Sequence, residues 1–183
     1  MKPAELLAHW VDDKHRGQLI KKTNDPYFTH LLAVAEMAAP LVLFGYQIGL
    51  CHDLLEDTRT TIDELKSALT SFGYAAEDAG YITFTVVELT DVYTSVAFPS
   101  LTKQERKERE AQRLYTVSPA AQTIKYCDLA DNIKWVLQHN NREHAIQYLE
   151  KKEHLVTALT AGHPEMRRKV LDVIQNDLRV LKA

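Results

Sequence analysis

The densest group of side chains able to do chemistry is His52-Asp53-Leu54-Leu55-Glu56-Asp57, at the end of the most apolar stretch of the chain. On a helix, residues four apart share a face, so His52 lies beside Glu56, and Asp53 beside Asp57. Three carboxylates and one imidazole then meet with no lysine or arginine nearer than Arg59. Burying unpaired carboxylates is costly, and a bound divalent cation would offset that cost. The alternative is a charged helix end that faces water.

A second group lies at residues 125–132, inside another apolar stretch. Asp128 and Asn132 are four apart and share a helix face. We expect Asp128 to be a metal ligand and Asn132 to contact the substrate. Considered alone, the segment is explained equally well by a surface ion pair between Asp128 and Lys125.

The third signal is His30, four residues after Pro26 in a stretch otherwise rich in leucine and valine. A lone histidine there is more often a core residue than a ligand. Together with His52, Asp53 and Asp128, however, it completes a set of nitrogen and oxygen donors that suits Mn, Fe or Zn. The other histidines show no ligand spacing and are interpreted as structural or surface residues.

The elements that position these residues are predicted to be helices throughout. Glycine and proline number only six each, and β-branched alternation is nearly absent. Asp25 and Pro26 look like an N-cap and first helical residue, and Thr61 with Glu64 fits a capping box. The expected helices cover residues 4–19, 26–39, 41–56, 61–73, 75–89, 102–115, 120–138, 142–160 and 165–181, with an irregular stretch at 91–101. The predicted fold class is all-α, a single domain over 1–183 that forms a bundle of about eight to ten helices.

The composition, 45% hydrophobic and 26% charged, is that of an ordinary globular chain of 183 residues. A formal charge of −3 gives no electrostatic reason to expect a nucleic-acid partner. No apolar run approaches the roughly 20 residues that cross a bilayer, and residues 1–13 lack the apolar core of a signal peptide. Cys51 and Cys127 lie in apolar runs, which indicates buried, reduced thiols. We therefore expect a cytoplasmic protein without a membrane or nucleic-acid partner.

In their order along the chain, His30, His52-Asp53 and Asp128 resemble the motif of the HD phosphohydrolase superfamily. Residues 15–18 and 21–30, together with His-Asp-x-x-Glu-Asp-Thr at 52–58, resemble more narrowly the (p)ppGpp hydrolase domains of the RelA/SpoT family and the small alarmone hydrolases. Further stretches match in the same order, so that the resemblance covers about residues 5–160. They are Glu88-Leu-Thr-Asp, Glu105-Arg-Lys, Lys125-x-x-Asp-x-x-x-Asn and Tyr148.

The resemblance implies a Mn²⁺ ion, or another divalent metal, held by His30, His52, Asp53 and Asp128. It implies hydrolysis of the 3′-pyrophosphate of guanosine (p)ppGpp to GDP or GTP and pyrophosphate. Glu56 and Asp57 would orient the attacking water and handle its proton, and which of them is the base stays open. The substrate would be contacted by Arg16, Lys21, Lys22, Thr23, Lys103, Arg106, Asn132 and Tyr148.

The chain also departs from the family pattern. Lys21 stands where arginine is usual, which weakens stacking on guanine. Asn24 takes a usual glycine position, where a residue that tolerates left-handed backbone is expected. The stretch 91–101 is longer and more apolar than its counterpart.

Other functions are open at this point. An HD-type phosphohydrolase or nucleotidase acting on another nucleotide would keep the four ligands without needing Lys21, Lys22, Thr23 or Tyr148. A non-catalytic nucleotide-sensing protein is a third possibility. Such a protein would not need Glu56 and Asp57 beside the ligands, which argues against it. Lys103 and Arg106 could instead belong to a solvent-exposed helix face whose charged residues pair with one another. An oligomer is compatible with the sequence.

Overall fold

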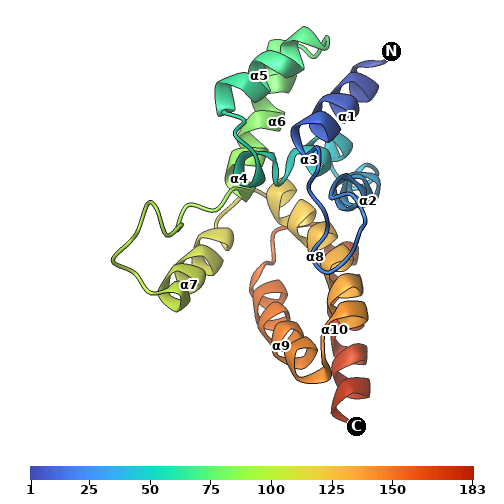
Figure 1. Cartoon of the computed structure of the whole chain (residues 1–183), viewed down its shortest axis with the longest axis vertical. Helices are drawn as coiled ribbons and strands as arrows, with labels where there is room; N and C mark the ends of the chain where they lie inside the picture. The colour runs from blue at the N-terminus through green and yellow to red at the C-terminus, as the bar shows by residue number, and fades with distance from the viewer. The chain divides into compact units, whose positions relative to one another are not determined.

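The computed structural model describes residues 1–183, and every regular element in it is a helix (Figure 1). The predicted all-α class is therefore confirmed. The chain divides into two compact units, Met1–Thr90 and Asp91–Ala183. The single domain expected from the sequence stays a prediction.

The first unit contains six helices arranged around α3. They are α1 (Pro3–Lys14), α2 (Phe28–Ala38), α3 (Gly45–Cys51), α4 (Leu54–Asp57), α5 (Ile62–Ser71) and α6 (Ala76–Leu89). α3 contacts α1, α2, α4 and α6, while α5 packs on α6. Ile48, Leu50 and Cys51 of α3 are fully buried, which makes this short helix the centre of the unit's core.

Two glycines allow α3 to lie directly on α2. A Cβ atom added at Gly49 would lie 2.6 Å from the Ala35 Cα, and one added at Gly45 would lie 2.1 Å from the Ala38 carbonyl oxygen. Any side chain at either position would push the two helices apart. This close approach matters for function because α2 carries His30 and α3 is followed at once by His52.

The predicted helices at 4–19 and 26–39 are shorter than expected. α1 ends at Lys14, and Gly17 follows with a left-handed φ of 83°. Two backbone hydrogen bonds, from Ile20 N to Asp25 O and from Tyr27 N to Gln18 O, both 2.9 Å, fold residues 15–27 into a loop. This closed loop takes Pro26 out of the helix, so α2 begins at Phe28.

The predicted helix at 41–56 is broken twice. Phe44 has a left-handed φ of 54°, so α3 begins only at Gly45. A second break separates α3 from α4 at His52 and Asp53. There His52 Nδ1 lies 2.7 Å from the Gly49 carbonyl oxygen, the group that a continuous helix would pair with the Asp53 amide. A side-chain bond of this kind competes with the helical ladder.

The second unit begins with the irregular stretch expected at 91–101 and continues in four helices. These are α7 (Lys103–Leu114), α8 (Pro119–His139), α9 (Arg142–Ala158) and α10 (Pro164–Lys182). The helices α8, α9 and α10 pack on one another (Figure 1). Each of the four starts at a side-chain cap: Thr102, Ser118, Asn141 and His163 accept from the third backbone N–H beyond them.

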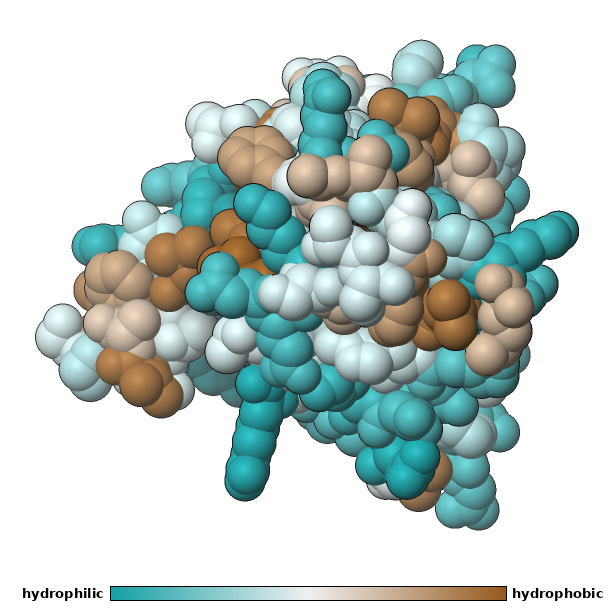
Figure 2. Space-filling view, turned by 90° about the horizontal axis from the view of Figure 1, so that it is seen from above, coloured by the Kyte–Doolittle hydropathy of each residue, from teal (hydrophilic) through white to brown (hydrophobic).

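Hydrophobic residues on the face seen in Figure 2 form separate patches among hydrophilic ones, as is usual for a protein surface. None of the helices combines the length and the apolar character that a membrane span requires. Cys51 and Cys127 are free and buried, as the sequence predicts.

Candidate metal centre and basic cavity

The packing of α2 on α3 gathers three of the four predicted ligands. One donor atom each of His30, His52 and Asp53 lies within 4.8 Å of the others. The two imidazole rings are 5.2 Å apart between centroids, and both histidines are only 3% exposed. Asp53 Oδ2 lies 3.1 Å from His52 Nε2 and 4.0 Å from His30 Nε2.

The chemistry of this cluster fits a divalent cation. The Gly49 carbonyl can only accept, so His52 Nδ1 must carry a proton, and Nε2 of the neutral ring then presents a lone pair. That lone pair faces a carboxylate oxygen 3.1 Å away. Two acceptors so close repel each other unless a proton or a metal ion lies between them. A histidine whose other nitrogen is fixed by a backbone carbonyl is also a common metal ligand.

The two predicted water-handling acids follow on α4. The Glu56 and Asp57 amides bond to the Asp53 carbonyl at 3.2 and 2.9 Å, which starts the helix and places both acids one turn beyond the predicted ligand Asp53. Both residues are exposed. Desolvation of the Asp57 carboxylate, and then the charge of Asp53, nevertheless raises its pKa above the usual range. A carboxylate with a raised pKa is a stronger base.

The loop between α1 and α2 brings further residues to this cluster that the sequence analysis did not assign to the site. The Tyr27 hydroxyl donates to Asp53 Oδ2 at 2.5 Å. Its ring lies between the rings of His15 and His30, at centroid distances of 5.6 and 5.5 Å. His15, interpreted from sequence as a structural or surface residue, is a buried member of this group. The signal was its place in the His15–Gln18 stretch that carries the family resemblance.

The loop's predicted substrate contacts are exposed or engaged locally. Arg16 is exposed and pairs with Asp13. Lys21 and Lys22 are exposed, and the Thr23 hydroxyl donates to the Ile20 carbonyl at 3.0 Å.

Asn24 tolerates a left-handed backbone but does not adopt one here, and the non-glycine residue of this loop with a positive φ is Lys22, at 66°. The Thr23 Oγ1 accepts from the Asp25 amide at 3.1 Å, which forms a local turn after Lys22.

Asp128, the predicted fourth ligand, lies on α8 in the second unit. It is 5% exposed, and its Oδ2 is 2.8 Å from Lys125 Nζ. Asn132 donates to its other carboxylate oxygen. The ion pair considered from sequence is therefore formed, but its carboxylate is buried and not at the surface. Asn132 orients Asp128 in this structure.

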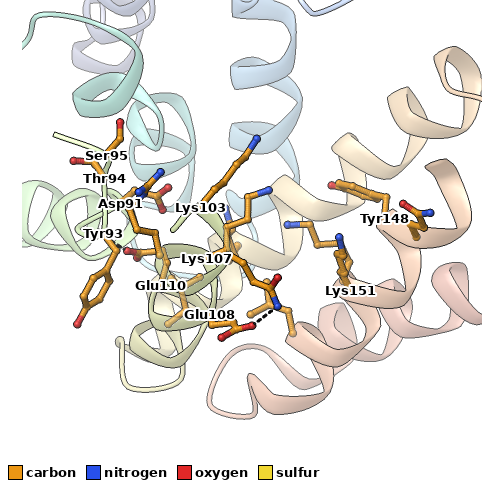
Figure 3. Close-up of a pocket in the computed structure, with 18 of the residues that line it drawn as sticks. Asp91, Tyr93, Thr94, Ser95, Lys103, Lys107, Glu108, Glu110, Tyr148 and Lys151 are labelled. Carbon is orange, nitrogen blue, oxygen red and sulfur yellow. Dashed lines mark hydrogen bonds between the residues drawn. The ribbon is translucent and has the colours of Figure 1, made fainter. Parts of the chain in front are cut away.

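A basic cavity of about 990 Å³ lies within the second unit. Figure 3 shows Lys103 and Lys107 extending from α7 on one side and Tyr148 and Lys151 on α9 on the other. The predicted substrate contacts Lys103, Arg106 and Tyr148 all line it. Six cations line the cavity, Lys103, Arg106, Lys107, Lys125, Lys151 and Lys152, against the three acids Asp91, Glu108 and Glu110. An excess of positive charge in a concave site favours an anionic ligand.

Lys152, which the sequence analysis did not single out, is one of these cations and has a lowered pKa. Its Nζ lies 5.3 Å from the centre of the Tyr148 ring, within the range of a cation–π contact. Burial first, and then the charges of Lys125 and Lys107, lower its pKa to about 8. Burial also raises the pKa of Tyr148, so its hydroxyl stays protonated as a hydrogen-bond donor.

The wall of the cavity is held by a buried carboxylate. Glu110 Oε2 accepts from the Val92 and Tyr93 amides, both at 3.0 Å, and Oε1 pairs with Arg113 at 2.5 Å. Glu108 also accepts from the Gln104 side chain at 2.9 Å. Six cations against three acids leave the lining with an excess of positive charge.

A helical fold with a His and a His-Asp pair brought together on packed helices is that of the HD-domain class. No protein-family model matches the chain. Guanosine-3′,5′-bis(diphosphate) 3′-pyrophosphohydrolase MESH1 of Homo sapiens is 32% identical over 72% of this chain and 69% of its own length. Its Mus musculus counterpart is 31% identical over 73% and 67%. The chain belongs to this family of (p)ppGpp 3′-pyrophosphohydrolases, as the sequence resemblance predicted.

Two further comparisons concern a much longer protein and a solved structure that matches over nearly its whole length. The GTP pyrophosphokinase of Streptomyces antibioticus is 27% identical over 97% of this chain, but the chain spans only 24% of that protein. A solved structure, described as a metazoan ortholog of SpoT that hydrolyzes ppGpp, superposes with a TM-score of 0.76 at 26% identity over 97% of both chains. The second match confirms the helical fold over nearly the whole chain.

Proposed function

We propose that the chain hydrolyses the 3′-pyrophosphate of a guanosine nucleotide, ppGpp or pppGpp, consuming one water and releasing pyrophosphate with GDP or GTP. The observation that carries the proposal is the cluster of His30, His52 and Asp53 beside the two acids of α4, in a member of a family named for this reaction. We expect the reaction to take place in the cytoplasm.

The metal proposed is Mn²⁺, with His30, His52 and Asp53 as ligands and Asp128 of the second unit as the fourth. The nitrogen and oxygen donors suit such an ion, and the facing lone pairs of His52 and Asp53 give the folded chain a reason to bind one. A bound divalent ion lowers the pKa of its water and polarises a phosphoryl group.

Glu56 and Asp57 have the roles of orienting the attacking water and taking its proton. Both carboxylates are exposed and follow the ligand Asp53 by one helical turn. The raised pKa of Asp57 favours proton transfer near neutral pH. A variant of one acid that binds metal normally but turns over slowly identifies the residue that acts on the water.

The proposed substrate contacts are those expected from the sequence. Arg16, Lys21, Lys22 and Thr23 of the first unit contact the guanosine end, and Asn132 reaches the substrate from α8 beside Asp128. Lys103, Arg106 and Tyr148 line the basic cavity, whose excess positive charge supports a role in binding phosphate groups. Lys107 and Lys152 add two cations to the contacts expected from sequence.

The test is the release of pyrophosphate and GDP from ppGpp by the purified protein, with Mn²⁺ and then with excess EDTA. We expect release that depends on the metal and stops in EDTA. GTP and GDP, which lack the 3′-pyrophosphate, are the matched control substrates and should not be hydrolysed. Failure to release pyrophosphate from either ppGpp or pppGpp, by protein that binds Mn²⁺, would contradict the proposed substrate.

A second candidate is an HD-type phosphohydrolase that acts on another nucleotide. The observation that favours it is the replacement of arginine by Lys21, which is exposed at a position where the family holds guanine. A panel of nucleotides carrying 2′-, 3′- or 5′-phosphates, assayed with Mn²⁺, separates the two: the guanosine proposal requires that ppGpp or pppGpp has the highest kcat/KM.

A further inference from the structure

The amide of Gln18 connects the loop between α1 and α2 to the end of α4. Its Nε2 donates to the Asp57 carbonyl oxygen at 2.7 Å, and its Oε1 lies 2.7 Å from His15 Nδ1. A carbonyl only accepts, so the NH₂ group must face Asp57, and the amide oxygen must face His15. His15 Nδ1 therefore carries a proton and donates to Gln18. One side chain thus fixes both the tautomer of a buried histidine and the position of a backbone group in the α4 segment.

His15 in turn supports Tyr27. The imidazole is 2% exposed and stacks on the phenol at an interplanar angle of 26°. The Tyr27 backbone amide is bonded to the Gln18 carbonyl at 2.9 Å, so ring and backbone are both held by the same short loop. Side chains fixed by packing and by hydrogen bonds hold their partners in one geometry.

The Tyr27 hydroxyl ends this chain of contacts at Asp53. Its bond to Oδ2 is 2.5 Å long, and the same oxygen is the one nearest His52 and His30. The bond therefore favours the side-chain torsions of Asp53 that keep this oxygen close to both histidines. The Asp53 backbone lies at the break between α3 and α4, where its carbonyl starts α4 by accepting from the Glu56 and Asp57 amides.

We propose that Tyr27, held by His15 and Gln18, is a positioning residue that orients the Asp53 carboxylate toward the proposed metal. Gln18 also holds the α4 segment that carries Glu56 and Asp57. The inference rests on the metal dependence proposed above. It assigns a function to three residues of one loop, none of which is a ligand itself.

The first test is the binding of Mn²⁺ to metal-stripped protein, measured by isothermal titration calorimetry. Loss of a hydrogen bond to a ligand typically weakens metal binding 10- to 100-fold, so Tyr27→Phe should raise the Kd by about that factor. Tyr81→Phe, at an exposed tyrosine of α6, is the matched control and should bind as the unaltered protein does. A Tyr27→Phe Kd within about twofold of the control would overturn the proposal.

Cobalt provides a readout that a general loss of stability would not change. The visible absorption of bound Co²⁺ reports the arrangement of its ligands, and we expect altered bands in Tyr27→Phe at saturating Co²⁺ but not in Tyr81→Phe. Identical spectra in both variants would contradict an orienting role. If the unaltered protein binds neither Mn²⁺ nor Co²⁺, the proposed metal dependence itself is wrong. That result is distinct from a failure of the role proposed for Tyr27.

Gln18→Glu tests the other half of the network and does not depend on Tyr27→Phe folding. Glutamate keeps an acceptor for His15 but cannot donate to the Asp57 carbonyl. We expect kcat with ppGpp to fall at least about tenfold, with KM and the Mn²⁺ Kd within about threefold of the unaltered values. An unchanged kcat would show that Gln18 does not position the α4 acids.

Discussion

His52 presents one ring nitrogen to Asp53 and the proposed metal site because the other is bonded to the Gly49 carbonyl. This bond selects the tautomer before any metal arrives, so that Nε2 is ready to act as a ligand. Glu56 is exposed and follows Asp53 by one helical turn. In the proposed function His52 binds the metal and Glu56 acts on the water, so variants of the two residues should have different effects.

We expect His52→Ala to abolish both Mn²⁺ binding and pyrophosphate release, since it removes a ligand. Glu56→Gln should keep the Mn²⁺ Kd near its original value and lower kcat by about 10²- to 10⁴-fold, the usual contribution of a general acid or base. Calorimetry and a stopped assay on the same preparations check both. A Glu56→Gln variant that turns over at nearly the full rate would leave Asp57 as the residue that handles the water.

Lys152 gives the basic cavity a pH dependence. Its pKa of about 8 means that the ammonium is present below this pH and is lost above it. Because kcat/KM reports the ionisation of the free protein, we expect kcat/KM for ppGpp to fall as pH rises through about 8. Lys152→Met should remove this step and lower kcat/KM at pH 7 by about tenfold or more, as expected for a lost hydrogen bond to a charged group.

Lys182→Met is the matched control for that experiment, since this lysine lies at the end of α10 and pairs with Glu150. Its pH profile should coincide with that of the unaltered protein. If Lys152→Met retained the fall near pH 8, another group would be responsible, and Lys152 would not bind the substrate.

The contact between α2 and α3 is the element on which the cluster depends. Gly45 and Gly49 are one helical turn apart, and both lie directly on α2 backbone. His30 of α2 and His52, which follows α3, therefore meet at a fixed separation. Gly49→Ala would place a methyl group 2.6 Å from the Ala35 Cα. The helices must then separate, although alanine itself favours a helix.

We expect Gly49→Ala to lower the free energy of unfolding by about 1–3 kcal/mol, the usual cost of overpacking a core. It should also weaken Mn²⁺ binding, because His30 and His52 move apart. Gly80→Ala, on α6 with no atom within 4 Å of its added Cβ, is the control and should be neutral or slightly stabilising. Chemical denaturation of both variants measures the difference. Equal stability would mean that the close approach of the helices relaxes without cost.

For the molecule as a whole, metal binding should appear as stability. An ion that binds only the folded chain adds about 2.7 kcal/mol at a free concentration 100 times its Kd. We expect Mn²⁺ to raise the Tm and EDTA to reverse the rise. Asp128→Asn should reduce the rise if Asp128 of the second unit is a ligand, and an unchanged rise would restrict the ligands to the first unit. Differential scanning calorimetry at matched free Mn²⁺ checks both.

Much of the architecture could be predicted because it depends on local sequence patterns. Apolar periodicity and the scarcity of glycine and proline gave the all-α class, and caps such as Thr61, which accepts from the Glu64 amide at 3.2 Å, placed helix starts within a few residues. The breaks at Phe44 and at His52–Asp53 could not be predicted, since apolar periodicity continues through both. The left-handed backbone of Phe44 interrupts the helix at the first break, and the bond from His52 to the Gly49 carbonyl interrupts it at the second.

For the site, the sequence by itself indicated the proposed ligands, because His30 and the pair His52-Asp53 are visible as polar residues within apolar stretches. The family also followed from ordered motifs. Only the tertiary structure decided which side chains support them. Tyr27 meets Asp53 across 26 residues of chain, Gln18 meets Asp57 across 39, and Lys152 of α9 lines one cavity with Lys107 of α7. Such contacts depend on how helices pack, and packing is set by shape and volume at positions far apart in sequence, which no local pattern records.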